Sequence, residues 1–161
     1  MTLTNKIELM APAGNFESLQ AALDNGCDSV YFGVEQLNMR ARSTVNFTIE
    51  DLKEIANRCE VKNVRSYLTL NTIIYDHDLS VVKTLLNKAK EANITAVIAS
   101  DQAVIAMART IGVEVHISTQ LNVTNIETIK FYSLFADTMV LSRELSLRQV
   151  KNITDQIEKE Q

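Results

Sequence analysis

Short apolar segments alternate along the chain with longer segments whose apolar residues recur at helical spacing. The short segments predict six strands: the first, expected to be buried, precedes Pro12, and the others occupy 29–32, 64–69, 96–99, 114–117 and 138–141. The longer segments predict six helices, with apolar stripes within 16–23, 52–59, 82–89, 104–111, 124–134 and 147–153. A strict alternation of strand and helix is typical of a parallel sheet covered by helices.

Several predicted helix ends carry residue types that stabilise such ends. Asn15 and Asp101 are typical N-cap residues, and Gly112 is expected to end the fourth helix. Two segments also match the capping box, in which a threonine precedes an acidic residue by three positions. They are Thr48 with Asp51 and Thr124 with Glu127. The last helix is expected to dissolve into the charged segment 158–161.

Six strand–helix units within 161 residues indicate one domain. A closed eight-unit barrel needs about 250 residues, so these units would form an incomplete barrel. The alternative is an open, doubly wound sheet, in which polar residues gather at one switch point. Here polar residues follow every predicted strand, and weak repeats at 26–30, 94–97 and 136–140 indicate similar units. We therefore predict an α/β fold, a single domain over 1–161 that is the N-terminal portion of a TIM-barrel-like catalytic domain with about six βα units.

Composition and charge narrow the function classes. The net charge of −4 argues against a broad basic face for nucleic acid but leaves room for a local basic patch. No apolar segment is long enough to span a bilayer and the N-terminus lacks the apolar core of a secretion signal, so we expect a cytoplasmic protein without a membrane partner. Cys27 and Cys59 form no CxxC motif and are interpreted as buried, inert thiols without a disulfide or a metal.

The stretch from Glu8 to Asn15 concentrates unusual backbone chemistry, because it holds the only proline and one of the four glycines. Pro12 fixes its own φ, and Gly14 permits a positive φ or a close approach of the backbone to a ligand. A strand that runs through a turn into a helix is where α/β proteins build sites. Pro12, Gly14 and Asn15 are therefore candidates for substrate binding, with a well-made turn as the alternative.

Other candidates for substrate binding follow later strands. Arg40 and Arg42, in a long loop, could bind phosphate or carboxylate through the planar guanidinium group, with solvated loop charge as the alternative. Asn71, Gln120 and Asn122 offer paired donors and acceptors that suit a planar substrate. Capping and loop hydrogen bonding are the alternative roles of these amides.

Candidates for acid–base chemistry are fewer. Glu144 could act as an acid or base beside Arg143 as a substrate clamp, or the two could form an ion pair that orients their loop. His116 lies inside the fifth strand, where a core histidine is favoured over a general base at the barrel mouth. Asp101 is favoured as an N-cap over a base, and His77 as part of a solvated turn over a weak metal ligand.

The sequence contains no HExxH, P-loop or GxSxG motif and no paired-cysteine metal site. It also shows no nucleophile–base pair, and serines such as Ser118 and Ser142 could equally form hydrogen bonds at strand ends. The residues alone therefore predict no hydrolytic mechanism.

Several ordered motifs resemble one known family. They are 8–15, 28–33, 38–42, 46–48, 68–72, 118–120 and 141–146, and the match runs from about Glu8 to Val150. The chain resembles the N-terminal part of the collagenase-like peptidases of unassigned catalytic type. The resemblance implies a TIM-barrel-like catalytic domain. It also implies collagen degradation, hydroxylation of uridine in tRNA with prephenate as a precursor, hydroxylation of cytidine in ribosomal RNA, or a part in anaerobic ubiquinone synthesis.

The resemblance also bears on cofactors, because several family members carry an iron–sulfur cluster. The family's cysteine-containing signature lies downstream of this chain, and Cys27 and Cys59 do not match it. We therefore expect no cofactor in this chain, while the resemblance allows an iron–sulfur cluster in a full-length protein.

Three hypotheses for function follow. The leading one is the front part of a barrel that assists RNA base hydroxylation, with RNA or a prephenate-like carboxylate as partner. The second is a true protease that acts on a peptide substrate with metal or catalytic residues supplied downstream. The third is a non-catalytic interaction module, or a homo-oligomer paired through the exposed edges of the first and sixth strands.

Overall fold

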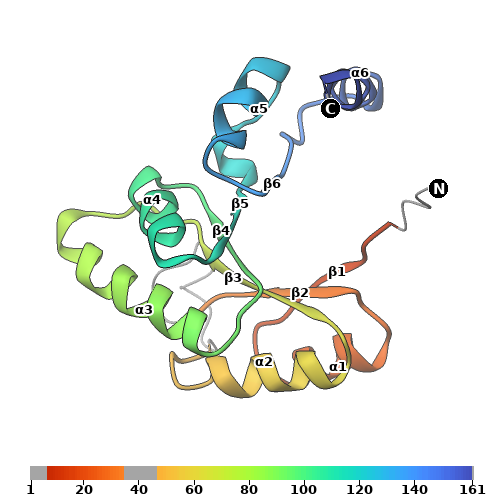
Figure 1. The fold of residues 1–161 in the computed structure, drawn as a ribbon. Helices are drawn as coiled ribbons and strands as arrows, with labels where there is room; N and C mark the ends of the chain where they lie inside the picture. Colours follow the sequence, from red (N-terminus) through yellow and green to blue (C-terminus); the bar gives the residue numbers. More distant parts are fainter. Residues whose placement is uncertain (1–6, 35–46, 161) are drawn as a thin grey trace.

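The computed structural model describes residues 7–34 and 47–160. Within them, six strands alternate with six helices, which confirms the predicted order (Figure 1). The strands are β1 (Met10–Pro12), β2 (Ser29–Phe32), β3 (Arg65–Leu70), β4 (Ala96–Ala99), β5 (Glu114–Ile117) and β6 (Thr138–Met139). The helices are α1 (Phe16–Asp24), α2 (Leu52–Val61), α3 (Leu79–Glu91), α4 (Gln102–Ile111), α5 (Ile126–Ser133) and α6 (Leu147–Glu160), and the short 3-10 helices are η1 (Asp76–Asp78) and η2 (Thr119–Leu121). No helix in these two ranges combines the length and the apolar character that crossing a membrane requires.

All neighbouring strands pair in parallel, in the order β1-β2-β3-β4-β5-β6. Tyr31 lies opposite Tyr67 in the register, and Ile98 lies opposite His116. The order never reverses, so the sheet lacks the switch point of a doubly wound fold, and that alternative is wrong. Among the described strands, β1 and β6 are the two edges. The six units therefore form a half-barrel of the TIM-barrel type.

Strand side chains alternate between a helix-covered face and an inner face. Val30, Leu68 and Val97 are fully buried on the side that carries the helices. The helix residues buried in the same core are Leu19, Leu23, Leu52, Ile55, Leu85, Leu86, Val104 and Ala108. The inner face carries a separate, smaller cluster of Tyr67, Ala96 and Ile98, against which Tyr31 packs. The main core thus lies between sheet and helices, and Figure 1 shows α1 to α4 on that one side of the strands.

Three helix ends form as the sequence predicts. Asn15 Oδ1 accepts the backbone N–H of Ser18 at 2.7 Å at the start of α1. Asp101 Oδ1 accepts the backbone N–H of Ala103 at 2.8 Å at the start of α4. Gly112 ends α4 in the left-handed conformation, with φ 83°. Local sequence therefore fixes these boundaries.

The predicted capping box of Thr124 and Glu127 is wrong. Asn125 has the extended backbone of an N-cap, and its Oδ1 accepts the backbone N–H of Thr128 at 2.9 Å. Asparagine is a better N-cap than threonine, so the competing side chain one position later takes the role.

Three further expectations are corrected. β6 stops two residues early, because Leu141 pairs instead with Val123 in an isolated bridge. β1 is not buried: Met10 is 42% exposed, since this strand has a neighbour on one side only. α6 continues to Glu160, because Ile157 extends the apolar face of the helix that packs on the core.

Candidate functional site at the strand ends

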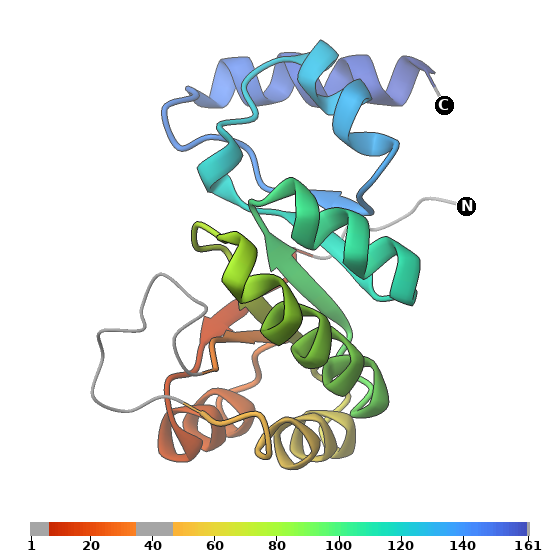
Figure 2. The same cartoon turned by 90° about the vertical axis from the view of Figure 1, so that its left-hand side faces the viewer.

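Parallel strands place their C-terminal ends on one edge of the sheet, where TIM barrels carry their active sites. The described segments that follow the strands are 13–15, 33–34, 71–78, 100–101, 118–125 and 140–146. We call these segments the strand-end surface. Figure 2, turned by 90° from Figure 1, shows α3 and α4 on the outside of the strands. The segments of the strand-end surface therefore connect the strands to the helical layer.

The turn after β1 is fixed by its own hydrogen bonds. The Ser18 hydroxyl accepts the backbone N–H of Gly14 at 3.0 Å and that of Asn15 at 3.1 Å. The Asn15 side-chain oxygen is used for capping α1. Gly14 does not have the positive φ that the sequence allowed, and a Cβ placed there would meet nothing within 4 Å. Space beside Gly14 therefore remains open to a ligand, and Pro12 lies exposed before it.

The ends of β3 and β5 carry amide side chains. Asn71 is partly exposed directly after β3, and Gln120 is exposed within η2. Asn122 is also exposed and has the left-handed conformation, with φ 49°, while its N–H donates to the Thr119 carbonyl at 3.0 Å. Asparagine tolerates this conformation better than most residues, which gives Asn122 a structural reason for its place. Asn71 and Gln120 keep their proposed role in orienting a planar substrate.

The end of β6 holds a fixed carboxylate. The buried Ser142 hydroxyl donates a hydrogen bond to Glu144. This bond holds the pKa of Glu144 below its usual range, with its own backbone and the charge of Arg143 acting in the same direction. Glu144 is therefore a carboxylate oriented chiefly by Ser142, suited to accepting hydrogen bonds rather than to donating a proton. Arg143 is exposed beside it.

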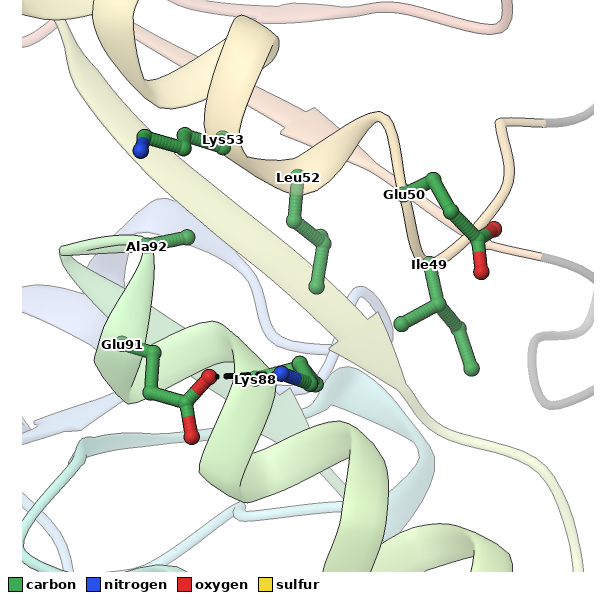
Figure 3. A pocket seen from close by; sticks show the side chains of 7 residues that line it. All are labelled: Ile49, Glu50, Leu52, Lys53, Lys88, Glu91 and Ala92. Atoms are coloured by element: carbon green, nitrogen blue, oxygen red, sulfur yellow. Dashed lines mark hydrogen bonds and ion pairs between the residues drawn. The ribbon is translucent and has the colours of Figure 1, made fainter.

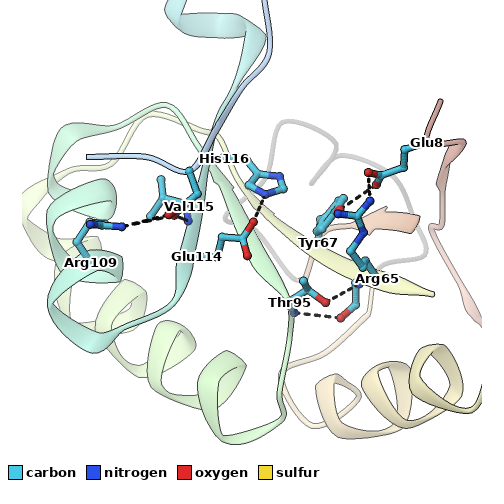
Figure 4. A network of polar contacts seen from close by, with 10 residues as sticks. Glu8, Arg65, Tyr67, Thr95, Arg109, Glu114, Val115 and His116 are labelled. Atoms are coloured by element: carbon cyan, nitrogen blue, oxygen red, sulfur yellow. Dashed lines mark hydrogen bonds and ion pairs between the residues drawn. The ribbon is translucent and has the colours of Figure 1, made fainter. Parts of the chain in front are cut away.

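His116 does not reach the strand-end surface. Its Nε2 lies 2.8 Å from Glu114 Oε1, and its ring centroid lies 4.7 Å from that of Tyr67 (Figure 4). The side chain is buried on the inner face, and its partner Glu114 is the first residue of β5. The histidine therefore turns towards the N-terminal end of the barrel. This is the arrangement of a satisfied core histidine, and it gives no support to a general base at the mouth.

The inner face carries a polar network that was not predicted from the sequence. Tyr67 Oη lies 2.8 Å from Glu8 Oε1, and the Arg65 guanidinium pairs with the same carboxylate (Figure 4). Burial raises the pKa of Tyr67 to about 12, and the bond to Glu8 acts in the same direction. Arg65 and Tyr67 are two positions apart in β3, a period that could have indicated a polar inner face. The network lies at the N-terminal end of the strands, the side of a barrel that serves stability.

A cavity of about 570 Å³ lies in the helical layer, between the start of α2 and the end of α3 (Figure 3). Lys88 Nζ and Glu91 Oε2 form an ion pair at 2.7 Å in its wall. That bond raises the pKa of Lys88. The other lining residues are Ile49, Glu50, Leu52, Lys53 and Ala92. Its positive and negative side chains balance, and none of the candidate residues lines it, so we do not place the functional site there.

Two candidates in the strand-end surface have local roles. Asp101 is an N-cap, as the sequence favoured. His77 is exposed, with its Nε2 3.6 Å from Asp78 Oδ1, and its ring lies parallel to that of Tyr75.

Among residues 7–34 and 47–160, no group of three or more His, Cys, Asp or Glu side chains could hold a metal ion. Arg40 and Arg42 lie outside the described residues.

The two cysteines do not fit an iron–sulfur cluster. Both are free and buried. Burial raises the pKa of Cys27, and it raises the pKa of Cys59 to about 11, whereas a cluster needs thiolates. No further ligand joins them within the described part of the chain. We therefore assign no chemical role to an iron–sulfur cluster held by these two cysteines.

Known proteins match the chain over nearly its whole length. The model of "Peptidase family U32" matches residues 14–161. A protein named "Collagenase" from Porphyromonas gingivalis is 56% identical over 153 residues, which cover 95% of this chain and 37% of that protein. "tRNA hydroxylation protein P1" from Bacillus subtilis is 30% identical, covering 97% of this chain and 37% of that protein. "23S rRNA 5-hydroxycytidine C2501 synthase" from Escherichia coli is 28% identical, covering 93% and 23%. The chain thus spans well under half the length of these relatives.

Solved structures share the fold. A U32 peptidase, Mk0906, has a TM-score of 0.74 at 14% identity, covering 93% of this chain and 65% of that chain. Deoxyribose phosphate aldolase from Aeropyrum pernix has a TM-score of 0.67 at 14% identity, covering 95% and 69%. At such identities the likeness shows the fold alone, a TIM-barrel-like one. The family match and the 56% identity together show that the chain belongs to peptidase family U32.

Proposed function

We propose that this chain is the front part of the catalytic barrel of an RNA-modifying protein, one that takes part in the hydroxylation of bases in tRNA or ribosomal RNA. Relatives named for tRNA hydroxylation and for 5-hydroxycytidine synthesis in 23S rRNA cover 97% and 93% of the chain and support the proposal. The chain spans only part of each, so the proposed activity is that of the whole protein.

The observation that carries the proposal is the chemistry of the strand-end surface. Asn71, Gln120 and Arg143 follow β3, β5 and β6 and carry planar amide or guanidinium groups. Such groups form paired hydrogen bonds with the edges of planar bases. Two serines of this surface are engaged locally: Ser118 Oγ accepts the N–H of Gln120 at 3.4 Å, and Ser142 donates to a carboxylate. This set suits the holding of a base better than attack on a peptide bond.

Binding of an anion by positively charged side chains is the second part of the proposal. Arg40 and Arg42 are proposed to bind RNA phosphate or a carboxylate such as that of prephenate, because a guanidinium group matches either anion. Their part rests on the sequence, since they lie outside the described residues. A local basic loop in a chain of net charge −4 suits a small contact with RNA rather than a broad one.

The level of hydroxylated bases in cellular RNA tests the proposal. In a strain that lacks the gene, the full-length protein should restore hydroxylated uridine or cytidine, measured by mass spectrometry of nucleosides from tRNA and rRNA. Gln120→Ala and Arg143→Ala should each lower the restored level by about tenfold, the loss expected for one good paired contact. Gln156→Ala is the matched control, because this exposed amide bonds only locally, to the Asn152 carbonyl on α6.

A peptidase is the second candidate, and the observation that favours it is the 56% identity to the protein named collagenase. The full-length protein and the gene-deletion strain also separate the two functions. Two results together would overturn the hydroxylation proposal. The full-length protein would cleave gelatin and lose this activity on Glu144→Gln, and the gene-deletion strain would keep the same level of hydroxylated nucleosides as the parent strain.

A further inference from the structure

Two exposed rings lie stacked on the strand-end surface, in the segment between β3 and α3. The rings of Tyr75 and His77 are parallel to within 3°, with centroids 5.7 Å apart. Tyr75 is 60% exposed, and the His77 side chain is 80% exposed. At this centroid separation the parallel rings are offset. Because both residues are mostly exposed, the rest of the protein leaves most of their surface uncovered.

The backbone that carries these rings is held in place. Asp78 Oδ2 accepts the backbone N–H of Tyr75 at 2.9 Å, and the backbone N–H of Asp78 donates to the Tyr75 carbonyl at 2.8 Å. The two residues thus bond each other in both directions across η1. His77 Nε2 is 3.6 Å from Asp78 Oδ1, which favours one orientation of the imidazole. A ligand that stacks here would meet a ring pair already ordered, which lowers the entropic cost of binding.

The position of the rings assigns them to the proposed site. The segment 71–78 begins with Asn71 at the C-terminal end of β3, the end at which barrel enzymes bind substrate. The neighbouring Ile73 is 72% exposed, so this segment presents apolar and aromatic surface that the fold leaves uncovered. Exposed apolar surface of this kind is typical of binding sites.

We propose that Tyr75 and His77 form a stacking platform for one unpaired base of an RNA substrate, an inference that rests on the proposed function. Unstacked bases of single-stranded RNA bind to aromatic side chains, tyrosine and histidine included, through face-to-face contact. Asn71, at the start of the same segment, carries an amide of the type that bonds base edges.

Charge around the rings favours a base over a phosphate. Asp76 and Asp78 flank His77, and both belong to η1. Two carboxylates repel a phosphate group, whereas the face of a neutral base carries no charge for them to repel. The platform should therefore add affinity without adding salt dependence, which comes from phosphate contacts.

Binding of an RNA hairpin with an unpaired loop tests the inference. Affinity of the full-length protein is measured by fluorescence anisotropy over a series of salt concentrations. Tyr75→Ala should weaken binding by about tenfold, the loss typical of one stacked base. The slope of log affinity against log salt should stay unchanged, because no phosphate contact is removed. Tyr75→Phe keeps the ring and should retain the affinity.

Two controls sharpen the test. Phe131→Ala removes a ring of similar exposure, 57%, from the C-terminal half of α5, which leads to the opposite end of the strands. It should leave RNA binding unchanged. Hairpins with one abasic loop position form the second control: at the position that stacks, Tyr75→Ala should cause no further loss.

The outcomes separate this inference from the proposed function. If the hairpin binds and Tyr75→Ala has no effect, the platform is wrong and the proposed function stands. If Tyr75→Ala weakens RNA binding only by changing the salt slope, the ring does not stack on a base, and the inference fails. If the unsubstituted protein binds gelatin peptides but no RNA, both the platform and the proposed function are overturned.

Discussion

At the scale of single residues, two glycines next to helix ends have different physical roles. Gly112 has φ +83°, and a Cβ there would lie 3.1 Å from Lys90 Nζ. That ammonium group donates to the Ile111 carbonyl at the end of α4, and an added methyl group would require it to shift by a few tenths of an ångström. Gly14 has no positive φ, and a Cβ there would meet nothing within 4 Å.

We expect Gly112→Ala to lower the free energy of unfolding by about 1–2 kcal/mol, the cost of a left-handed backbone for an L residue. Gly14→Ala is the control and should change stability by less than about 0.5 kcal/mol, as an exposed substitution without strain does. Urea unfolding at equilibrium measures both. Equal losses for the two variants would contradict the argument from backbone conformation.

At the scale of elements, α5 tests which of two adjacent side chains caps a helix. Asn125 Oδ1 accepts both the backbone N–H and the hydroxyl of Thr128, at 2.9 and 3.1 Å. Asn125→Ala should therefore lower the free energy of unfolding by about 1 kcal/mol. Thr124→Ala, one residue earlier, removes no cap and should be nearly neutral. Thermal unfolding followed by circular dichroism checks the pair, and a larger loss for Thr124→Ala would restore the capping-box interpretation.

The strands and their ends show what the sequence can and cannot predict. The alternation of Val115 and Ile117 with polar residues over 114–117 identifies a strand, and it places His116 on the face opposite to these two apolar side chains. The contact between Glu8 and Tyr67 could not be predicted, because it joins residues 59 positions apart and depends on how β1 and β3 are placed. The strand-end candidates follow from strand order, whereas the parallel rings of Tyr75 and His77 depend on the geometry of η1.

At the scale of the whole molecule, the half-barrel has two open edges. Within the described residues, β1 pairs only with β2, and β6 pairs only with β5. Ile7 and Leu9, at the approach to β1, are 90% and 59% exposed. An edge strand with apolar neighbours and unpaired backbone groups is a template for pairing with another chain. This supports the expectation that homo-oligomers form through the sheet edges.

We expect the 161-residue chain to associate with itself as its concentration rises, as seen in the mass measured by multi-angle light scattering. Leu9→Lys should shift the chain towards the monomer, because a charged side chain beside an edge strand opposes pairing. Leu147→Lys is the matched control: Leu147 is 88% exposed, but it lies on α6 rather than beside an edge strand. Equal shifts for both variants would indicate general hydrophobic association, and a monomer at every concentration would contradict pairing through the edges.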